Sequence, residues 1–305
     1  MKFMLAMQRP MREDVAGIGV ESELAGTRAI RFAPRGVKRA RGKVLVVHGV
    51  TPRGLVDPRM VHLSDSLAAA GFEVFAPEFP GLQRADLRPV TVAQISTYAE
   101  ALGPEVRLLA PSFAGGLCLR AVAEGATVRS VCSIGGYGHV RDSLARLLTP
   151  AVDAYPRIAV CLNLGVFDDA EAEALRAWLW DDSVRGPERR YPPFRAGLSP
   201  EQGARVDGVI AGTWPDLPDW FTKLPDDVDR LDVSSVADRI RVPVVLIHGA
   251  GDRVIPPSES VELARLLPDA TVCVTSLLTH GDAVPAWKKP AAIRSMGAAF
   301  ARFLG

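Results

Sequence analysis

The sequence predicts an α/β protein in which helices flank a mainly parallel central sheet. Short runs rich in Val, Ile and Leu alternate along the chain with stretches of helical character. These runs lack strict polar–apolar alternation, which is typical of strands that are covered on both faces. Several of the helical stretches stop at a glycine, the usual residue at a helix C-terminus. Alternation of strand and helix favours parallel strands joined by right-handed crossovers.

The apolar runs predict the order of the elements. Seven strands are predicted, over residues 29–33, 44–47, 74–76, 107–110, 131–134, 244–248 and 271–274. Helices are predicted between them, over residues 61–70, 92–102, 115–124 and 258–267. In an open parallel sheet, ligands bind outside the carboxyl ends of the strands. The residues that directly follow each apolar run are therefore the candidates for function.

A long region interrupts this alternation before the strand at 244–248. Helices predicted at 170–180 and 200–211 are separated there by a Pro- and Arg-rich stretch. The region holds too many aromatic and aliphatic residues for a disordered linker. We therefore expect residues 149–236 to form a mostly helical cap, inserted into an α/β core made of residues 1–148 and 237–305.

Two tryptophans, Trp178 and Trp180, lie on the first helix of this expected cap. Large aromatic side chains contribute most when they are buried against other apolar groups. The two indoles either line a substrate pocket or hold the cap against the core, and the sequence leaves both alternatives open.

Composition and charge exclude several classes of protein. Of the 305 residues, 48% are hydrophobic and 23% are charged, as in an ordinary soluble protein. The net charge of +1 provides no electrostatic reason to bind nucleic acid or an anionic membrane. No run approaches the roughly 18 apolar residues needed to span a bilayer, and the apolar start of the chain is too short for a secretory signal. We expect a cytoplasmic protein, and the sequence does not indicate its oligomeric state.

The cysteines and the loops provide no sign of a bound metal or cofactor. Each cysteine stands alone in an apolar stretch, without the spacing of zinc or redox sites: Cys118, Cys132, Cys161 and Cys273. We interpret them as small buried hydrophobic residues in a reducing compartment. The chain also has no Gly-rich phosphate loop and no cluster of metal ligands, so we expect no metal and no organic cofactor.

A candidate nucleophile, Ser112, lies where the apolar run 107–110 ends and a helix begins. This layout is that of a nucleophile elbow, a sharp strand-to-helix turn that exposes a hydroxyl above the sheet. Small residues are needed two positions before and after the serine, because the turn presses strand and helix together. The usual residue at both positions is Gly, and here both are alanines, Ala110 and Ala114. The alternative is a turn serine that bonds to its own backbone.

A serine becomes a useful nucleophile when a base takes its proton and a third group orients that base. In proteins with this elbow the acid and then the histidine follow the serine along the chain. Asp252 lies in a Gly-rich loop after the strand at 244–248, and His280 follows the strand at 271–274. Asp142 is a rival acid but lies outside a Gly-rich loop, and Asp282 is better placed to cap the final helix.

Together these features resemble the α/β-hydrolase fold superfamily, over roughly residues 29–303. The resemblance rests on the His48–Gly49 pair after an early strand, the Gly-x-x-Asp loop that ends at Asp252, and the late Thr279–His280 pair. The segments Asp57-Pro58-Arg59 and Ala76-Pro77-Glu78-Phe79-Pro80-Gly81 resemble a broad, uncharacterised bacterial branch of it. Members commonly carry a cap after strand 6, which matches the interruption described above.

The resemblance implies roles for backbone groups as well as side chains. In acyl-transfer enzymes of this design, an N–H of the early His-Gly loop and the N–H after the serine bind the oxyanion. We assign these donors to Val50 and Phe113. His48 could act as a second base, but in this superfamily it usually maintains the shape of its loop.

The expected function is that of a serine hydrolase that cleaves a carboxylic ester, or a related acyl bond, of a small-molecule acyl substrate. Ser112 would form the acyl-enzyme, with His280 as base and Asp252 as its orienting acid. The fold also hosts other functions. The alternatives are an acyltransferase, a cofactor-free lyase or cyclase, and a catalytically silent protein that binds a small molecule.

Overall fold

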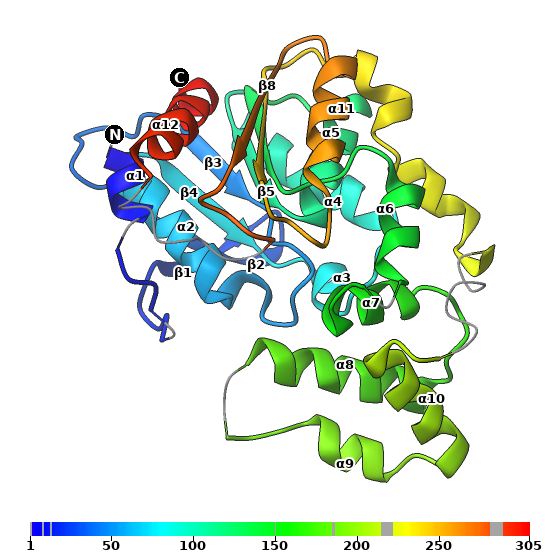
Figure 1. Ribbon diagram of the computed structural model, residues 1–305. Helices are drawn as coiled ribbons and strands as arrows, with labels where there is room; N and C mark the ends of the chain where they lie inside the picture. Colours follow the sequence, from blue (N-terminus) through cyan, green and yellow to red (C-terminus); the bar gives the residue numbers. More distant parts are fainter. Residues whose placement is uncertain are drawn as a thin grey trace.

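The computed structural model describes residues 2–7, 9–12, 14–149, 151–184, 187–214, 222–280 and 289–305. Within them, eight strands form one sheet in the order β1-β2-β4-β3-β5-β6-β7-β8 (Figure 1). Their bounds are β1 Val20–Leu24, β2 Thr27–Phe32, β3 Lys43–Val46, β4 Glu73–Pro77, β5 Arg107–Pro111, β6 Ser130–Ile134, β7 Val244–Gly249 and β8 Ala270–Thr275.

The sheet is mainly parallel, as the alternation of elements predicts. Strands β4, β3, β5, β6, β7 and β8 pair in parallel, and only the pairings of β2 with β1 and β4 are antiparallel within the described residues. All seven predicted strands are present. The eighth, β1, was not predicted, and it pairs with β2 alone at the edge of the sheet.

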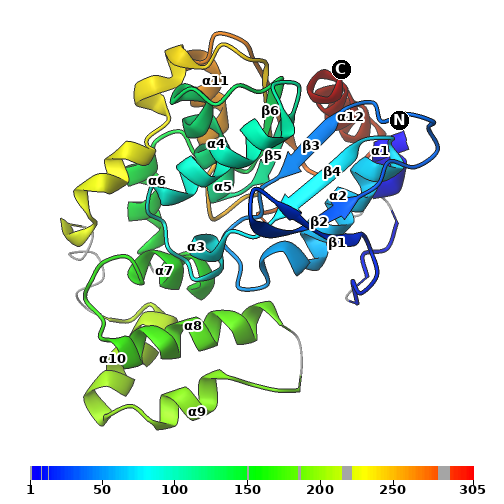
Figure 2. The ribbon, with the colours of Figure 1, turned by 180° about the vertical axis from the view of Figure 1, so that it is seen from behind.

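Helices cover both faces of the sheet (Figure 2). The α-helices are α1 Lys2–Met7, α2 Pro58–Ala69, α3 Pro80–Gln83, α4 Val90–Leu102, α5 Phe113–Ala123, α6 Val140–Leu147, α7 Ala154–Cys161, α8 Asp169–Ser183, α9 Tyr191–Ala196, α10 Pro200–Ala211, α11 Pro257–Leu266 and α12 Pro290–Leu304. In the described parts of the chain, 3₁₀ helices include η1 Gly54–Val56, η3 Asp226–Leu231 and η4 Ser234–Arg239.

Alternate residues along a strand point to opposite faces, and this divides the core into two clusters. On β3, Val44 and Val46 pack with α1, α2 and α12, whereas Leu45 packs with α4, α5 and α11. On β5, Leu108 joins the second cluster and Leu109 the first. The molecule therefore has three layers, with the sheet buried between two layers of helices.

Helices α6 to α10 lie in sequence between β6 and β7, in the region where a cap was expected. In Figure 1 and Figure 2, α8, α9 and α10 lie together beneath the sheet and its flanking helices. The Glu171 carboxylate of α8, which is fully buried, accepts from the Arg205 guanidinium of α10 at 2.7 and 2.8 Å. Apolar side chains of α8 and α10 continue the larger core cluster, so these helices pack as part of the same body.

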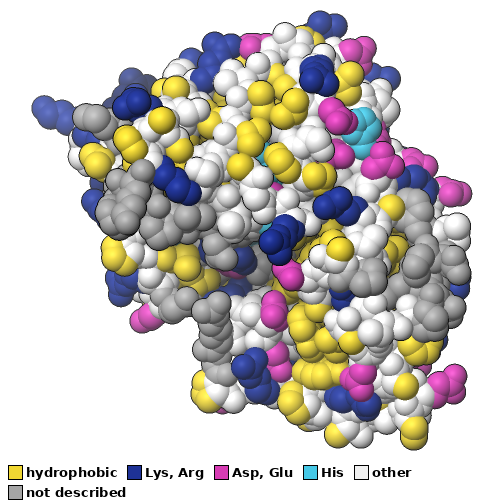
Figure 3. Space-filling model, viewed as in Figure 1, with side chains coloured by type: hydrophobic (Ala, Val, Ile, Leu, Met, Phe, Trp, Pro, Cys, Tyr) yellow, Lys and Arg dark blue, Asp and Glu magenta, His cyan; other side chains and the backbone are white. Residues whose placement is uncertain are grey.

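The surface agrees with the balanced composition. Figure 3 shows Lys and Arg side chains interspersed with Asp and Glu over the visible face. Among the described residues, no helix has the length and apolar character needed to cross a bilayer, and no group of His, Cys, Asp and Glu is placed to hold a metal ion. All four cysteines are buried and unpaired with one another.

Candidate active site

Ser112 occupies the tight turn between the end of β5 and the start of α5. Its backbone has φ of 56° and ψ of −141°, a conformation that residues with a side chain rarely adopt. Two hydrogen bonds stabilise the turn: the Ser112 N–H donates to the Ile134 carbonyl at 2.7 Å, and the Ser112 carbonyl accepts from the Gly115 N–H at 2.9 Å. Such strained positions persist only where the surrounding structure enforces them, and they cluster at functional sites.

Close packing around the turn depends on glycines that follow the serine. A Cβ atom on Gly115 would collide with the Ser133 hydroxyl, and one on Gly116 would collide with the buried ring of Tyr137. Ala110 and Ala114, the two alanines that replace the usual glycines, are fully buried. Gly115 therefore lets α5 pack closely on β6, and Gly116 leaves room for the ring of Tyr137.

The structure brings Ser112, His280 and Asp252 into one chain of hydrogen bonds. Ser112 Oγ lies 3.0 Å from His280 Nε2, and His280 Nδ1 lies 2.8 Å from Asp252 Oδ2. A carboxylate only accepts hydrogen bonds, so Nδ1 carries the hydrogen and Nε2 accepts from the serine hydroxyl. The three side chains lie beyond the carboxyl ends of β5, β8 and β7, as ligand sites in parallel sheets do.

The Asp252 side chain is 1% exposed, and its carboxylate has donors at both oxygens. Its Oδ1 accepts from the backbone N–H groups of Val254 and Ile255, at 2.9 and 3.0 Å. Burial alone would raise the pKa of this carboxyl, but hydrogen bonds from His248 and His280 outweigh it and hold the pKa well below its usual range. The group is therefore ionised throughout the neutral range and can orient His280.

A second histidine, His248, faces Asp252, and sequence reasoning missed this role. His248 is fully buried at the end of β7, with Nε2 at 3.5 Å from Asp252 Oδ2 and 2.9 Å from the Ile255 carbonyl. Because the Ile255 carbonyl can only accept, Nε2 carries the hydrogen of the ring. The other nitrogen, Nδ1, accepts from Ser260 Oγ on α11 at 2.7 Å. The available signal was the His248–Gly249 pair, which repeats His48–Gly49 at the end of another buried strand.

The two predicted oxyanion donors belong to the helix that begins after the serine and to a loop beside it. Phe113 is the first residue of α5, where an N–H has no partner within the helix. The loop of Val50 lies close by, because a Cβ built on Gly49 would be 3.5 Å from Ser112 Cβ. Within the described part of the chain, neither the Val50 N–H nor the Phe113 N–H donates to a protein acceptor. Both are available to a ligand oxygen.

His48 bonds to backbone groups through both ring nitrogens. Its Nδ1 lies 2.8 Å from the Gly49 carbonyl, and its Nε2 accepts from the Phe79 N–H at 3.3 Å. Burial lowers the pKa of this imidazole to about 4, so the ring is neutral at neutral pH, with its hydrogen on Nδ1. His48 thereby holds the peptide between Gly49 and Val50, and the N–H of that peptide is the predicted Val50 donor.

The structure does not bring Trp178 or Trp180 to the hydrogen-bonded chain of Ser112. Trp178 packs against the core cluster and borders a cavity of about 300 Å³ between α8 and the segment before and within α9. The Arg190 guanidinium lies over the Trp180 ring, with Arg190 Cζ at 3.5 Å from the ring centroid. In the described residues neither indole contacts the serine, the histidine or the aspartate, and their substrate-binding role stays a prediction.

Of the two alternative acids, Asp142 lies in the described part of the chain and Asp282 does not. Asp142 lies exposed in the first turn of α6, away from the hydrogen-bonded chain that ends at Asp252. Asp282, which we expected to cap the final helix, lies outside the described residues.

No protein-family model matches the chain, and no curated protein matches it. Solved structures do match it over nearly its whole length. A monoacylglycerol lipase from Paleococcus ferrophilus is 19% identical, with a TM-score of 0.53 over 92% of this chain and 99% of that one. A proline iminopeptidase from Mycobacterium smegmatis is 16% identical, with a TM-score of 0.52 over 93% of this chain and 98% of that one.

A third similar structure is a meta-cleavage product hydrolase from Pseudomonas fluorescens. It is 17% identical, with a TM-score of 0.51 over 93% of this chain and 97% of that one. At these identities the likeness concerns the fold rather than the substrate. The matched architecture is the eight-stranded, mostly parallel sheet with flanking helices described above. The chain therefore has the fold of the α/β-hydrolase superfamily.

Proposed function

We propose that the protein is a serine hydrolase that cleaves a carboxylic ester of a small-molecule acyl substrate. The observation that carries the proposal is the chain of hydrogen bonds from Ser112 through His280 to Asp252, at 3.0 and 2.8 Å. The strained conformation of Ser112 supports it, because nucleophile elbows hold their serine in this way. Similar folds in a lipase and a peptidase agree with hydrolysis of an acyl bond.

The first half of the reaction forms an acyl-enzyme. Ser112 Oγ attacks the carbonyl carbon while His280 Nε2 takes the hydroxyl proton, and Asp252 stabilises the imidazolium that results. The N–H groups of Val50 and Phe113 bind the oxyanion, and each such donor is commonly worth about 3 kcal/mol. When the tetrahedral intermediate collapses, the bond to the leaving alcohol breaks and His280 gives the alcohol its proton.

The second half releases the acid. His280 takes a proton from a water molecule, and the oxygen of that water attacks the acyl carbonyl, whose oxygen occupies the same oxyanion site. Collapse of this second tetrahedral intermediate returns the proton from His280 to Ser112 Oγ. The protein ends as it began, and no metal or organic cofactor enters any of these steps.

We further propose that residues 149–236 act as the cap of this site, with residues 1–148 and 237–305 as its core. Helices α7, α8 and α10 support this division, because they pack on one another and α7 contacts α6 of the core. A direct bond also joins the two parts: the Tyr155 hydroxyl on α7 donates to the Val50 carbonyl at 3.1 Å. Within the cap, Trp178 and Trp180 remain our proposed substrate contacts.

The proposal is tested by turnover of p-nitrophenyl esters over a series of acyl lengths, with the wild-type protein and Ser112→Ala. We expect turnover by the wild type and its loss in the variant, and the preferred acyl length reports the size of the pocket. A p-nitroanilide series measured in parallel distinguishes an esterase from an amidase. Equal turnover by wild type and Ser112→Ala would contradict the role of the serine.

A further inference from the structure

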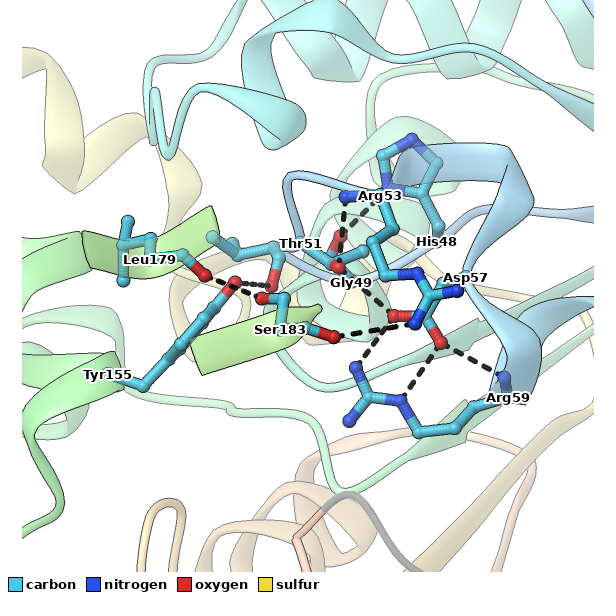
Figure 4. Close-up of polar contacts among 10 residues, drawn as sticks. His48, Gly49, Thr51, Arg53, Asp57, Arg59, Tyr155, Leu179 and Ser183 are labelled. Atoms are coloured by element: carbon cyan, nitrogen blue, oxygen red, sulfur yellow. Dashed lines mark hydrogen bonds and ion pairs between the residues drawn. The ribbon is translucent and has the colours of Figure 1, made fainter. Parts of the chain in front are cut away.

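The inserted helices bond directly to the loop that follows β3 (Figure 4). The Tyr155 hydroxyl, on α7, donates to the Val50 carbonyl at 3.1 Å. The Arg53 guanidinium donates to the carbonyl of Ser183, the last residue of α8, at 3.4 Å. Figure 4 shows Ser183 between these two contacts. Residues more than 100 positions apart in the sequence thus meet at the loop of the proposed oxyanion donor.

The Tyr155 bond acts on the peptide next to the oxyanion donor. The Val50 N–H belongs to the peptide that joins Gly49 and Val50. The carbonyl oxygen of this peptide is that of Gly49, and it bonds to His48 Nδ1 at 2.8 Å. The Val50 carbonyl belongs to the following peptide, and it accepts from Tyr155. The planes of the two peptides set φ and ψ of Val50. Holding both planes therefore fixes the direction in which the Val50 N–H points.

The core holds the loop at its far end through other groups, on Thr51 and Asp57. The Thr51 hydroxyl donates to the buried carboxylate of Asp57 at 3.0 Å, and the Arg59 guanidinium bonds to the same carboxylate at 2.7 and 3.0 Å. Asp57 also caps α2. The Val50 carbonyl instead accepts from the Tyr155 hydroxyl of the inserted helix α7.

The tyrosine is suited to this task because its hydroxyl stays protonated. Tyr155 is partly buried and packs against the main core cluster. Burial raises the pKa of its phenol to about 12. The hydroxyl is therefore protonated at neutral pH and can donate to the Val50 carbonyl.

We propose that Tyr155 is a positioning residue, whose hydrogen bond directs the Val50 N–H toward the oxyanion. It thereby couples the packing of the inserted helices on the core to catalysis. This inference rests on the proposed hydrolase function. A loosened cap would turn the donor away from the oxyanion, and acyl transfer would slow although Ser112, His280 and Asp252 stay in place. Tyr155 touches neither the substrate nor the reacting atoms.

The test compares Tyr155→Phe with the wild type. The substitution keeps the ring and removes only the hydroxyl, so we expect kcat to fall about 3- to 10-fold, the size of one lost hydrogen bond. We expect KM to change less than twofold, because the oxyanion forms only in the transition state. A trifluoromethyl ketone that carries the preferred acyl chain forms a tetrahedral adduct, and its affinity should fall by the same factor as kcat.

Tyr98→Phe is the matched control. It keeps the ring and removes a hydroxyl that donates to Thr27 Oγ1 on β2 at 3.0 Å, without a bond to the Val50 carbonyl. We expect this variant to lose a similar amount of stability in a thermal melt and to keep the wild-type kcat. A purely structural role for Tyr155 would give the two variants the same kinetics.

The outcomes separate this inference from the proposed function. If the wild type does not turn over any ester, the hydrolase proposal fails, whatever Tyr155→Phe does. If the wild type is active and Tyr155→Phe keeps its kcat, or loses only substrate affinity, the positioning role is overturned. A lower kcat without weaker binding of the trifluoromethyl ketone overturns it as well.

Discussion

His248 Nε2 lies 3.5 Å from Asp252 Oδ2, the carboxylate oxygen that also accepts the His280 bond at 2.8 Å. Backbone N–H groups of Val254 and Ile255 occupy the other oxygen. The carboxylate therefore has its donors in place before any substrate binds. An ionised Asp252 favours the His280 tautomer with its hydrogen on Nδ1, in which Nε2 accepts from the Ser112 hydroxyl.

Asp252→Asn tests this selection directly. The amide retains the shape of the side chain but presents a donor in place of an acceptor, so His280 is held in the wrong tautomer. We expect kcat to fall about 10³- to 10⁴-fold with little change in KM. Asp142→Asn, on the exposed face of α6, is the control and should be fully active. A reversed pattern would assign the acid to Asp142.

The buried His48 predicts a dependence of stability on pH. The pKa of His48 is about 4 in the folded protein, whereas an unperturbed histidine, as in the unfolded chain, has a pKa of 6.5. Between these values the unfolded chain binds more protons, so stability rises with pH across this window and is lost as pH falls from 6.5 toward 4. The full effect is about 3 kcal/mol.

Urea unfolding at pH 7, 6, 5 and 4 measures this dependence. His48→Gln removes the titrating group, and we expect a shallower fall in the free energy of unfolding for this variant than for the wild type. The comparison uses the slope with pH, because the substitution also shifts stability at every pH. Parallel curves for the two proteins would show that His48 does not stay neutral when folded.

Gly116→Ala tests the packing of the elbow. A methyl group at this position would collide with the ring of Tyr137, which is 1% exposed. Overpacking of this kind costs about 1–3 kcal/mol, which exceeds the helix propensity that alanine gains over glycine. We expect a lower melting temperature. Gly297→Ala is the helical control, because its Cβ would meet only Met4 Cγ at 3.6 Å, and it should melt at or above the wild-type temperature.

Much of the fold was predictable because buried parallel strands leave a plain signal. Runs such as Val244–Gly249 are buried along their whole length, and their sequence is apolar to match. Strand β1 has the sequence VESEL and only Leu24 is buried, so it carries no apolar pattern. It exists because β2 offers it an edge to pair with, and that edge is a tertiary feature.

The location of three candidate site residues was predictable for a related reason. Ser112, Asp252 and His280 each follow a strand, and the carboxyl ends of parallel strands meet at one edge of the sheet. The contact of the Tyr155 hydroxyl with the Val50 carbonyl depends instead on two groups, 105 positions apart in the sequence, that meet only after folding. No spacing in the sequence encodes such contacts, and Tyr155 lies in a helix, α7, that the pattern did not predict.

Covalent labelling by a fluorophosphonate is the most direct measurement of the central claim, that Ser112 is an activated nucleophile. We expect the wild type to gain one phosphonyl group, which peptide mass spectrometry places on Ser112. Ser112→Ala should not be labelled. The control is Ser96→Ala, which removes a hydroxyl that donates to the Val92 carbonyl on α4, and it should be labelled like the wild type. Labelling of Ser112→Ala at the wild-type rate, or labelling of the wild type at another residue, would contradict the account.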